Sequence, residues 1–270
     1  MNNENIPLTV FEDPDALGDD LAKDILAGSE TACKAGRRFV LGCPGGRSLR
    51  STYRALGVLA GARKADLSHV VIAMMDDYVE RQGETFVYCP AEAHYSCRRF
   101  AREEIQETLN QGLTSRHRIP SSQVWFPDPA EPAAYDETLS ADGGVDIFLI
   151  ASGATDGHVA FNPIGTPIDS GSRVIHLDTL TRQDNLKTFP RFSGLSEVPS
   201  YGVSVGLGTI SRLSRRVVLV IHGAHKREAV RQLLLLTDFS PKWPASVIYC
   251  CRQPQILIDI AAAAVLKKHT

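Results

Sequence analysis

Short apolar segments alternate along this chain with stretches whose apolar residues recur at helical spacing. Between Leu17 and Leu26 the apolar residues fall on one face of a helix, which we expect over residues 14–35 because Gly36 then ends the pattern. Further helices are predicted after the first strand through Leu56, over roughly 92–112 and over 225–236. Strands are predicted at 38–43, 70–75, 123–126, 145–151 and 217–221.

The predicted strands are apolar throughout and are separated by helices. This pattern is typical of a mostly parallel, twisted sheet covered by helices on both faces, so we predict an α/β fold. The most linker-like stretch is PDPAEP at 127–132, yet Tyr135 and the strand after residue 144 resume the pattern. We therefore expect residues 1–270 to form a single domain.

Three polar clusters each follow a predicted strand. They are PGGRS at 44–48, DDY at 76–78 and ATDGH at 154–158. In parallel sheets ligands bind beyond the carboxyl ends of the strands, near a switch in strand order. The sequence therefore predicts one site built from these three clusters.

The glycine turn is suited to an anion. Gly45 and Gly46 allow close approach of the backbone, and Ser48 opens a helix whose free N–H groups favour negative charge. The pattern is neither GxxxxGK[ST] nor GxGxxG, so a nucleotide triphosphate or a dinucleotide is not indicated. A plain turn between a strand and a helix remains the alternative.

The other two clusters carry acid–base groups. Asp76 and Asp77 point to opposite sides of an extended chain, so only one of these carboxylates faces a given ligand; a helix cap is the alternative. Asp156 lies two residues before His158 and could fix its tautomer, which suits proton transfer near neutral pH. A loop histidine bonded to the backbone is the alternative there. No second His or Cys stands at ligand spacing, so no metal is expected.

Composition narrows the class of protein. Hydrophobic residues make up 43% and charged residues 22% of the 270 residues, and the net charge is -2. These values are ordinary for a globular protein and argue against nucleic acid as a partner. No apolar run is long enough to cross a membrane, and the first residues do not resemble a signal peptide. The six cysteines are not arranged in CxxC pairs, so we expect reduced, non-catalytic thiols in a cytoplasmic protein.

These motifs, in this order, resemble the glucosamine-6-phosphate deaminase/isomerase and 6-phosphogluconolactonase superfamily. The MDDY and GHVAFN segments are closer to the deaminases, whereas GGRS is closer to the lactonases. The resemblance covers nearly the whole chain and rests on LGCPGGRSLRSTYRAL (41–56), IAMMDDYV (72–79), HYSCRRF (94–100), DIFLIASGATDGHVAFN (146–162), VPSYGVSVGLGTI (198–210) and VLVIHGAHKREAV (218–230).

The resemblance implies a Rossmann-like fold and an enzyme that acts on a small phosphorylated sugar without a cofactor. Asp76 would move a proton during aldose–ketose isomerisation, and His158, held by Asp156, would open the sugar ring. The substrate phosphate would bind Gly45, Gly46, Arg47, Ser48 and Lys226. Lys187 or Arg191 would add a further positive charge. A homo-oligomer is compatible with this resemblance.

One position departs from the deaminase pattern. The deaminases carry a glutamate after the Asn of their GHIAFNEP segment, and here Asn162 is followed by Pro163. Asp169, the nearest acid in sequence, is the candidate to take its place. The sequence is compatible with three classes of protein: a deaminase or isomerase, a lactonase in which His158 activates water, and a sugar-phosphate sensor without turnover.

Overall fold

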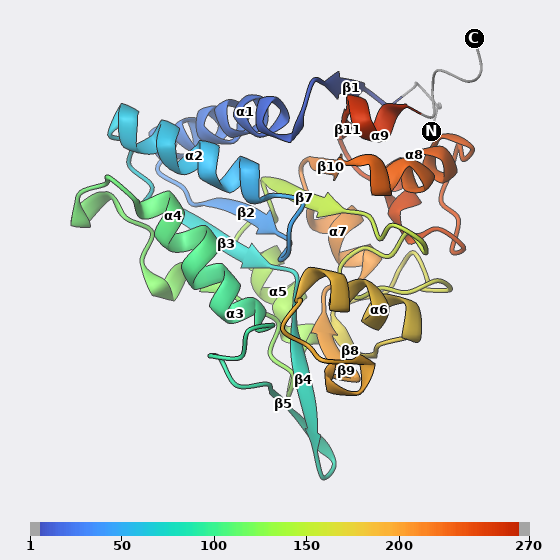
Figure 1. Cartoon of the computed structure of the whole chain (residues 1–270). Helices are drawn as coiled ribbons and strands as arrows, with labels where there is room; N and C mark the ends of the chain where they lie inside the picture. Colours follow the sequence, from blue (N-terminus) through green and yellow to red (C-terminus); the bar gives the residue numbers. More distant parts are fainter. Residues whose placement is uncertain (1–5, 265–270) are drawn as a thin grey trace.

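A seven-stranded parallel sheet forms the centre of the protein. The computed structural model describes residues 6–264. All neighbouring strands of the sheet pair in parallel, which confirms the predicted fold class (Figure 1). The order across the sheet is β1 (Leu8–Phe11), β11 (Pro254–Asp259), β10 (Val217–Ile221), β7 (Ile147–Ala151), β2 (Phe39–Cys43), β3 (Val70–Met74) and β6 (Val124–Trp125).

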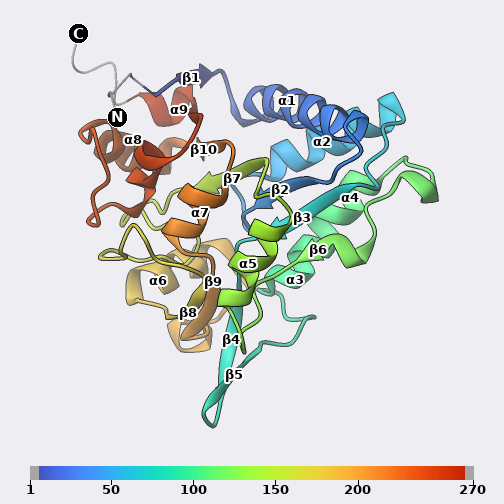
Figure 2. The same cartoon turned by 180° about the vertical axis from the view of Figure 1, so that it is seen from behind.

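Helices cover both faces of this sheet, as predicted. Alternate residues of each strand serve the two faces, so that Leu41 packs into one buried cluster and Val40 into the other. One cluster includes residues of α1 (Pro14–Lys34), α2 (Arg50–Arg63), α3 (Cys97–Phe100) and α4 (Glu107–Asn110). The other includes residues of α5 (Ala133–Ala141), α7 (Leu207–Leu213), α8 (Arg227–Leu234) and α9 (Ile260–Ala263) (Figures 1 and 2).

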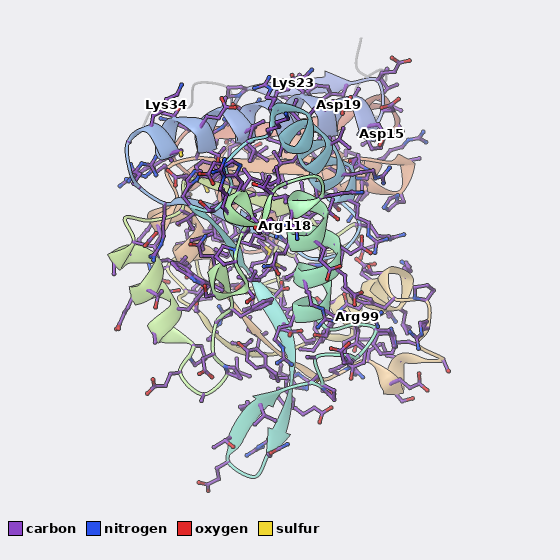
Figure 3. The ribbon with its side chains drawn as sticks, turned by 90° about the vertical axis from the view of Figure 1, so that its left-hand side faces the viewer. Asp15, Asp19, Lys23, Lys34, Arg99 and Arg118 are labelled. Carbon is purple, nitrogen blue, oxygen red and sulfur yellow. The ribbon has the colours of Figure 1, made fainter. Side chains whose placement is uncertain are left out.

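The first helix illustrates how local sequence and burial agree. The side chain of Asp13 accepts hydrogen bonds from the N–H groups of Asp15 and Ala16, which caps the start of α1. The apolar face of α1 is buried against the sheet, whereas Asp19 and Lys23 are exposed on its outer face (Figure 3). The helix therefore lies where its pattern of apolar residues predicts.

A second, antiparallel sheet was not predicted. Its order is β5 (Thr85–Tyr88), β4 (Asp76–Gln82), β9 (Tyr201–Ser204) and β8 (Arg173–His176). Only Met75 separates β3 from β4, so the DDY cluster is the start of a new strand and not a turn after the old one. The hairpin of β4 and β5 projects from the body of the molecule (Figures 1 and 2).

Several predicted boundaries were wrong. The helix expected over 92–112 starts at Cys97, and a π-helical segment, Ala101–Gln106, joins α3 to α4. The helix expected over 225–236 begins as a 3₁₀ turn, Ala224–Lys226, and α8 ends at Leu234. Helix α6 (Thr179–Thr188) was not predicted and lies beside the second sheet (Figure 1).

The strand order changes direction at β2. The chain passes from β2 to β3 on one side, whereas β7 pairs with the other side of β2. Loops that leave the carboxyl ends of β2 and β7 therefore diverge and open a crevice. No helix within residues 6–264 is both long and apolar enough to span a membrane.

The contact between α2 and α4 provides a test of the packing. A Cβ atom on Gly57 would lie 2.2 Å from the carbonyl oxygen of Thr108, which is backbone and cannot rotate away. Alanine favours a helix over glycine by about 1 kcal/mol, but overpacking costs about 1–3 kcal/mol. We expect Gly57→Ala to lower the free energy of unfolding in urea. Gly61→Ala, with 3.0 Å to the nearest backbone oxygen, is the matched control and should be tolerated better. Equal stability of the two variants would contradict this packing.

Candidate functional site

A pocket of about 660 Å³ opens at the carboxyl ends of β2, β3, β7 and β10. Helix α6 supplies a further wall. The lining includes all of the predicted site residues except Asp156, namely Gly45, Gly46, Arg47, Ser48, Asp76, His158 and Lys226. The structure therefore brings the three polar clusters together.

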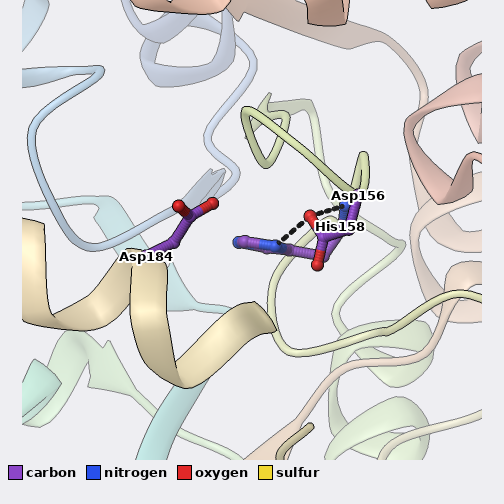
Figure 4. Close-up of side chains that lie close together, drawn as sticks. All are labelled: Asp156, His158 and Asp184. Atoms are coloured by element: carbon purple, nitrogen blue, oxygen red, sulfur yellow. Dashed lines mark hydrogen bonds and ion pairs between the residues drawn. The ribbon is translucent and has the colours of Figure 1, made fainter. Parts of the chain in front are cut away.

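Asp156 lies behind His158 and holds its ring. The Nδ1 atom of His158 lies 2.7 Å from Oδ1 of Asp156, and the same oxygen accepts the backbone N–H of His158 at 3.2 Å (Figure 4). Asp156 is fully buried, and bonding to His158 lowers the pKa of its carboxyl despite the opposing effect of burial. Because Asp156 remains ionised, it favours the tautomer that carries hydrogen on Nδ1, and Nε2 is left for a ligand.

Two glycines make room for this pair. A Cβ atom on Gly153 would lie 2.2 Å from Oδ1 of Asp156 and 2.4 Å from Nδ1 of His158. Gly157 has a φ of +67°, and a Cβ atom there would lie 2.4 Å from the Trp243 ring. Position 153, just before the pair in sequence, and position 157, between its two members, are therefore glycines for steric reasons.

Asp76 and Asp77 face opposite sides of β4, as predicted. Asp76 lines the pocket and is 6% exposed. Asp77 points away and accepts hydrogen bonds from the backbone N–H groups of Tyr78 and Cys97, each at 2.8 Å, and from Nε of Arg98 at 3.0 Å. Only Asp76 is therefore available to a ligand.

Burial changes the acid strength of Asp76. It raises the pKa of this carboxyl from its usual value to about 7, against the smaller effect of a hydrogen bond from the thiol of Cys97. The thiol donates to Oδ1 of Asp76 over 3.4 Å. A carboxyl with this pKa can both accept and return a proton near neutral pH.

The glycine turn and the end of β10 form the basic part of the pocket. Gly46 has a φ of +83°, which turns the chain toward Arg47 and Ser48. His222 donates from Nε2 to the carbonyl of Ser48 over 3.0 Å, and thereby joins β10 to the turn. Lys226 donates to the carbonyl of Ser152 over 2.5 Å, and burial lowers the pKa of its amine.

The structure distinguishes between the two candidates for an added positive charge. Lys187, on α6, lines the pocket and pairs with Asp184 over 3.3 Å. Arg191 is exposed and is not among the lining residues. Lys187 is therefore the candidate that reaches the pocket.

Sequence reasoning missed several lining residues, among them Cys97, Asp184, His222 and His225. The two histidines lie in the HGAHK segment, and its position directly after a predicted strand is the signal that could have located them. Asp184 had no signal, because α6 itself was not predicted. Asp169, the acid expected near His158, is exposed, does not line the pocket, and has its carbonyl bonded by Arg212.

Asp184 lies on the far side of the His158 ring from Asp156. One ligand atom each from Asp156, His158 and Asp184 fall within 4.8 Å of one another, the sole such group among the described residues (Figure 4). Asp156 and Nδ1 of His158 are already bonded to each other, and Lys187 and Lys226 line the same pocket. This donor set suits proton transfer better than a cation.

Helix α6 is held to the rest of the site at both ends. The hydroxyl of Thr181 donates to Oδ2 of Asp156 over 3.5 Å, and the side chain of Asp178 caps the helix. At the other end the ring of Phe189 packs edge-on against Tyr78, with 6.2 Å between ring centroids.

All six cysteines of the chain are free thiols.

The chain is similar in sequence to proteins named glucosamine-6-phosphate deaminase. No family model matches the chain. The chain is 31% identical to a glucosamine-6-phosphate deaminase of Streptomyces avermitilis, over 92% of each protein. A deaminase of the same name from Pseudarthrobacter chlorophenolicus is 36% identical over 61% of this chain, but the alignment spans only 64% of that protein.

Solved structures agree on the fold. A monomeric glucosamine-6-phosphate deaminase superimposes with a TM-score of 0.80 at 24% identity, over 96% of this chain and 100% of the other. A 6-phosphogluconolactonase from Shewanella baltica superimposes with a TM-score of 0.67 at 19% identity, over 95% of this chain and 98% of the other. The chain belongs to the glucosamine-6-phosphate deaminase family.

The buried charge of Asp76 predicts a pH-dependent effect on stability. The folded chain binds the Asp76 proton up to about pH 7, whereas the unfolded chain releases it near the ordinary aspartate pKa of 3.8. The stabilisation is complete below the lower value and is lost as pH rises through the higher one. We expect Asp76→Asn to leave stability little changed near about pH 4 and to raise the free energy of unfolding by about 2–4 kcal/mol near about pH 8. Urea titrations at both pH values measure this.

The exposed Asp20 on α1 supplies the matched control. Asp20→Asn removes a carboxylate without removing a buried charge, so its effect on stability should be small at both pH values. If Asp76→Asn is no more stabilising at the higher pH than at the lower, Asp76 is not a carboxyl of raised pKa.

Proposed function

We propose that this chain opens the ring of a phosphorylated amino sugar, glucosamine 6-phosphate or a close analogue, and converts it to a ketose phosphate with release of ammonia. The observation that carries the proposal is the meeting of Asp76 and the Asp156–His158 pair in a pocket whose other lining includes Arg47 and Lys226. The names of its relatives support the substrate class.

In the proposed reaction His158 works first. Its Nε2 takes the proton of the C1 hydroxyl and delivers it to the ring oxygen of the sugar as the bond between that oxygen and C1 breaks, which leaves an aldehyde at C1. Asp156 holds the imidazole in orientation through the 2.7 Å bond to Nδ1. The sugar is then open.

Asp76 works second. Its carboxylate takes the proton from C2 of the aldehyde, and the carboxylic acid so formed returns a proton to C1. A proton of the amine passes to O1, so the product is a C2 imine with a C1 hydroxyl, which water converts to the ketose with loss of ammonia. A carboxyl with a pKa of about 7 suits this exchange, because both its ionised and its protonated forms are populated near neutral pH. The phosphate would lie on the glycine turn, with Lys226 and Lys187 as counter-charges.

Asp184 is our candidate for the second carboxylate partner of His158, in place of Asp169. Its side chain is 15% exposed, and an oxygen lies within 4.8 Å of a His158 ring nitrogen. That separation leaves room for one hydroxyl or amine of a sugar between them. We infer that Asp184 accepts a hydrogen bond from the group that exchanges its proton with His158.

A phosphosugar lactonase is the second candidate function. Pro163 replaces the glutamate of the deaminase pattern, and lactonases share the fold. In that reaction His158 would activate water for attack on the lactone, and Asp76 would have no proton to move between carbons. The two functions therefore differ in what they require of Asp76.

A small metabolite is the proposed partner, and we propose a cytoplasmic location for the protein. Two neighbouring basic residues form ion pairs, Arg98 with Asp77 and Arg99 with Glu103. These pairs support a structural role for the two arginines and not a role in binding nucleic acid. A sensor without turnover would bind the same sugars. Turnover in the assay below separates the two.

The activity test is a panel of amino-sugar phosphates, ketose phosphates and phospholactones, with ammonia, ketose and acid measured separately. We expect ammonia and ketose from glucosamine 6-phosphate. Removing a general acid or base lowers a rate by about 10²- to 10⁴-fold, so His158→Gln and Asp76→Asn should each lose turnover in that range. Affinity for the ketose phosphate product should change little in either variant.

The pattern across the two variants decides between the functions. If Asp76→Asn keeps full activity while His158→Gln abolishes it, and a lactone is the substrate, the lactonase function replaces the deaminase. If both variants match the parent on every substrate that is turned over, the chemistry takes place elsewhere.

Asp184 has its own test. We expect Asp184→Asn to lower kcat on the cyclic substrate by about 10- to 10²-fold, and Asp184→Glu to recover part of that loss, because the carboxylate acts through the group bonded to His158. Binding of an open-chain amino-alditol phosphate, whose ring needs no opening, should change little. Gln183→Ala, an exposed neighbour on α6, is the control. Loss of affinity for the open-chain compound and for orthophosphate, with kcat intact, would instead place Asp184 in phosphate binding.

A further inference from the structure

The thiol of Cys97 touches the carboxylate proposed as the base. Its Sγ donates to Oδ1 of Asp76 over 3.4 Å, and the two residues are 5% and 6% exposed. Both line the pocket. No other side chain of the described residues forms a hydrogen bond with Asp76. The thiol is thus the donor that can fix this carboxylate directly.

The backbone of Cys97 is fixed by the neighbouring carboxylate. Oδ1 of Asp77 accepts the N–H of Cys97 over 2.8 Å, and Arg98 bonds Oδ2 of Asp77 over 3.0 Å. The hydroxyl of Ser96 caps the same turn by accepting the N–H of Arg99 over 3.3 Å. Asp77 therefore holds the first turn of α3 in the position from which the Cys97 side chain reaches Asp76.

The thiol also borders the glycine turn. A Cβ atom built on Gly45 would lie 3.5 Å from Sγ of Cys97. The sulfur therefore lies between the glycine turn and Asp76 and limits the space into which the carboxylate can rotate. Van der Waals contact and the hydrogen bond both act on the same rotamer.

We propose that Cys97 is a positioning residue for Asp76: its thiol holds the carboxylate toward the pocket and favours the ionised form that accepts a proton. The role of Asp76 as base rests on the proposed function, whereas the contact and its effect on ionisation do not. No covalent step at sulfur is involved.

The other groups around Asp76 come from several elements. The charge of Asp77 opposes ionisation of Asp76, and His158 favours it. Tyr53 on α2 and Tyr78 on β4 also interact with its charge. Burial holds the pKa of the Cys97 thiol well above its usual range. The sulfur therefore keeps its hydrogen, and remains a donor, throughout the range in which Asp76 titrates.

The test is a ¹³C NMR titration of the Asp76 carboxyl, with the signal assigned by its absence in Asp76→Asn. In Cys97→Ala the carboxyl loses its donor, so we expect the titration midpoint to rise by about half a pH unit, the size expected for a weak hydrogen bond. Cys97→Ser retains a donor and should titrate below Cys97→Ala. If the alanine variant does not fold, Cys97→Val removes the donor while filling the volume.

Cys89→Ala is the matched control, because Cys89 is also buried but its thiol faces Glu80 and does not line the pocket. Its Asp76 midpoint should equal that of the parent. Equal midpoints in the parent, Cys97→Ala and Cys97→Ser would overturn the proposal and leave Cys97 a packing residue. The acid limb of kcat/KM should move with the NMR midpoint. Absence of sugar-phosphate turnover would refute the proposed function, and the titration would still decide the role of Cys97.

Discussion

The ion pair of Asp77 and Arg98 joins strand β4 to helix α3 at the site. Asp77 is fully buried at the start of β4, and its oxygens accept three backbone N–H groups besides the Arg98 side chain. A buried charge left without its partner costs about 3–5 kcal/mol, so this carboxylate fixes α3 to β4. Because neighbouring residues of a strand face opposite ways, the same contact directs Asp76 into the pocket.

The basic and acidic groups of the pocket balance one another. Lys187 pairs with Asp184, and Asp184 also offsets the desolvation that lowers the pKa of Lys226. Under the proposed function, the phosphate of the substrate would compete with Asp184 for the same lysines. The carboxylate on α6 would then be the group that the phosphate displaces.

The sequence predicted the part of this architecture that depends on periodicity. Apolar strands such as β7 and β10 were located because both of their faces are buried, and their loops met at one sheet edge as parallel order requires. The second sheet escaped prediction because β4 follows β3 after a single residue and carries polar residues throughout its outer half. Asp184 and Cys97 reach the pocket through tertiary contacts of α6 and α3, which no local pattern records.

The two glycines around the Asp156–His158 pair restrict how this protein can evolve. Any side chain at Gly153 would displace the pair, and any at Gly157 would meet Trp243 as well as an unfavourable φ. No single substitution at these two positions is tolerated. A change of substrate must therefore come from substitutions elsewhere in the pocket wall, where a new side chain fits. Helix α6 offers such room, since Gln183 is exposed beside pocket-lining residues and Lys187 is an exposed lining residue. New specificities are therefore accessible through α6 without disturbing the imidazole.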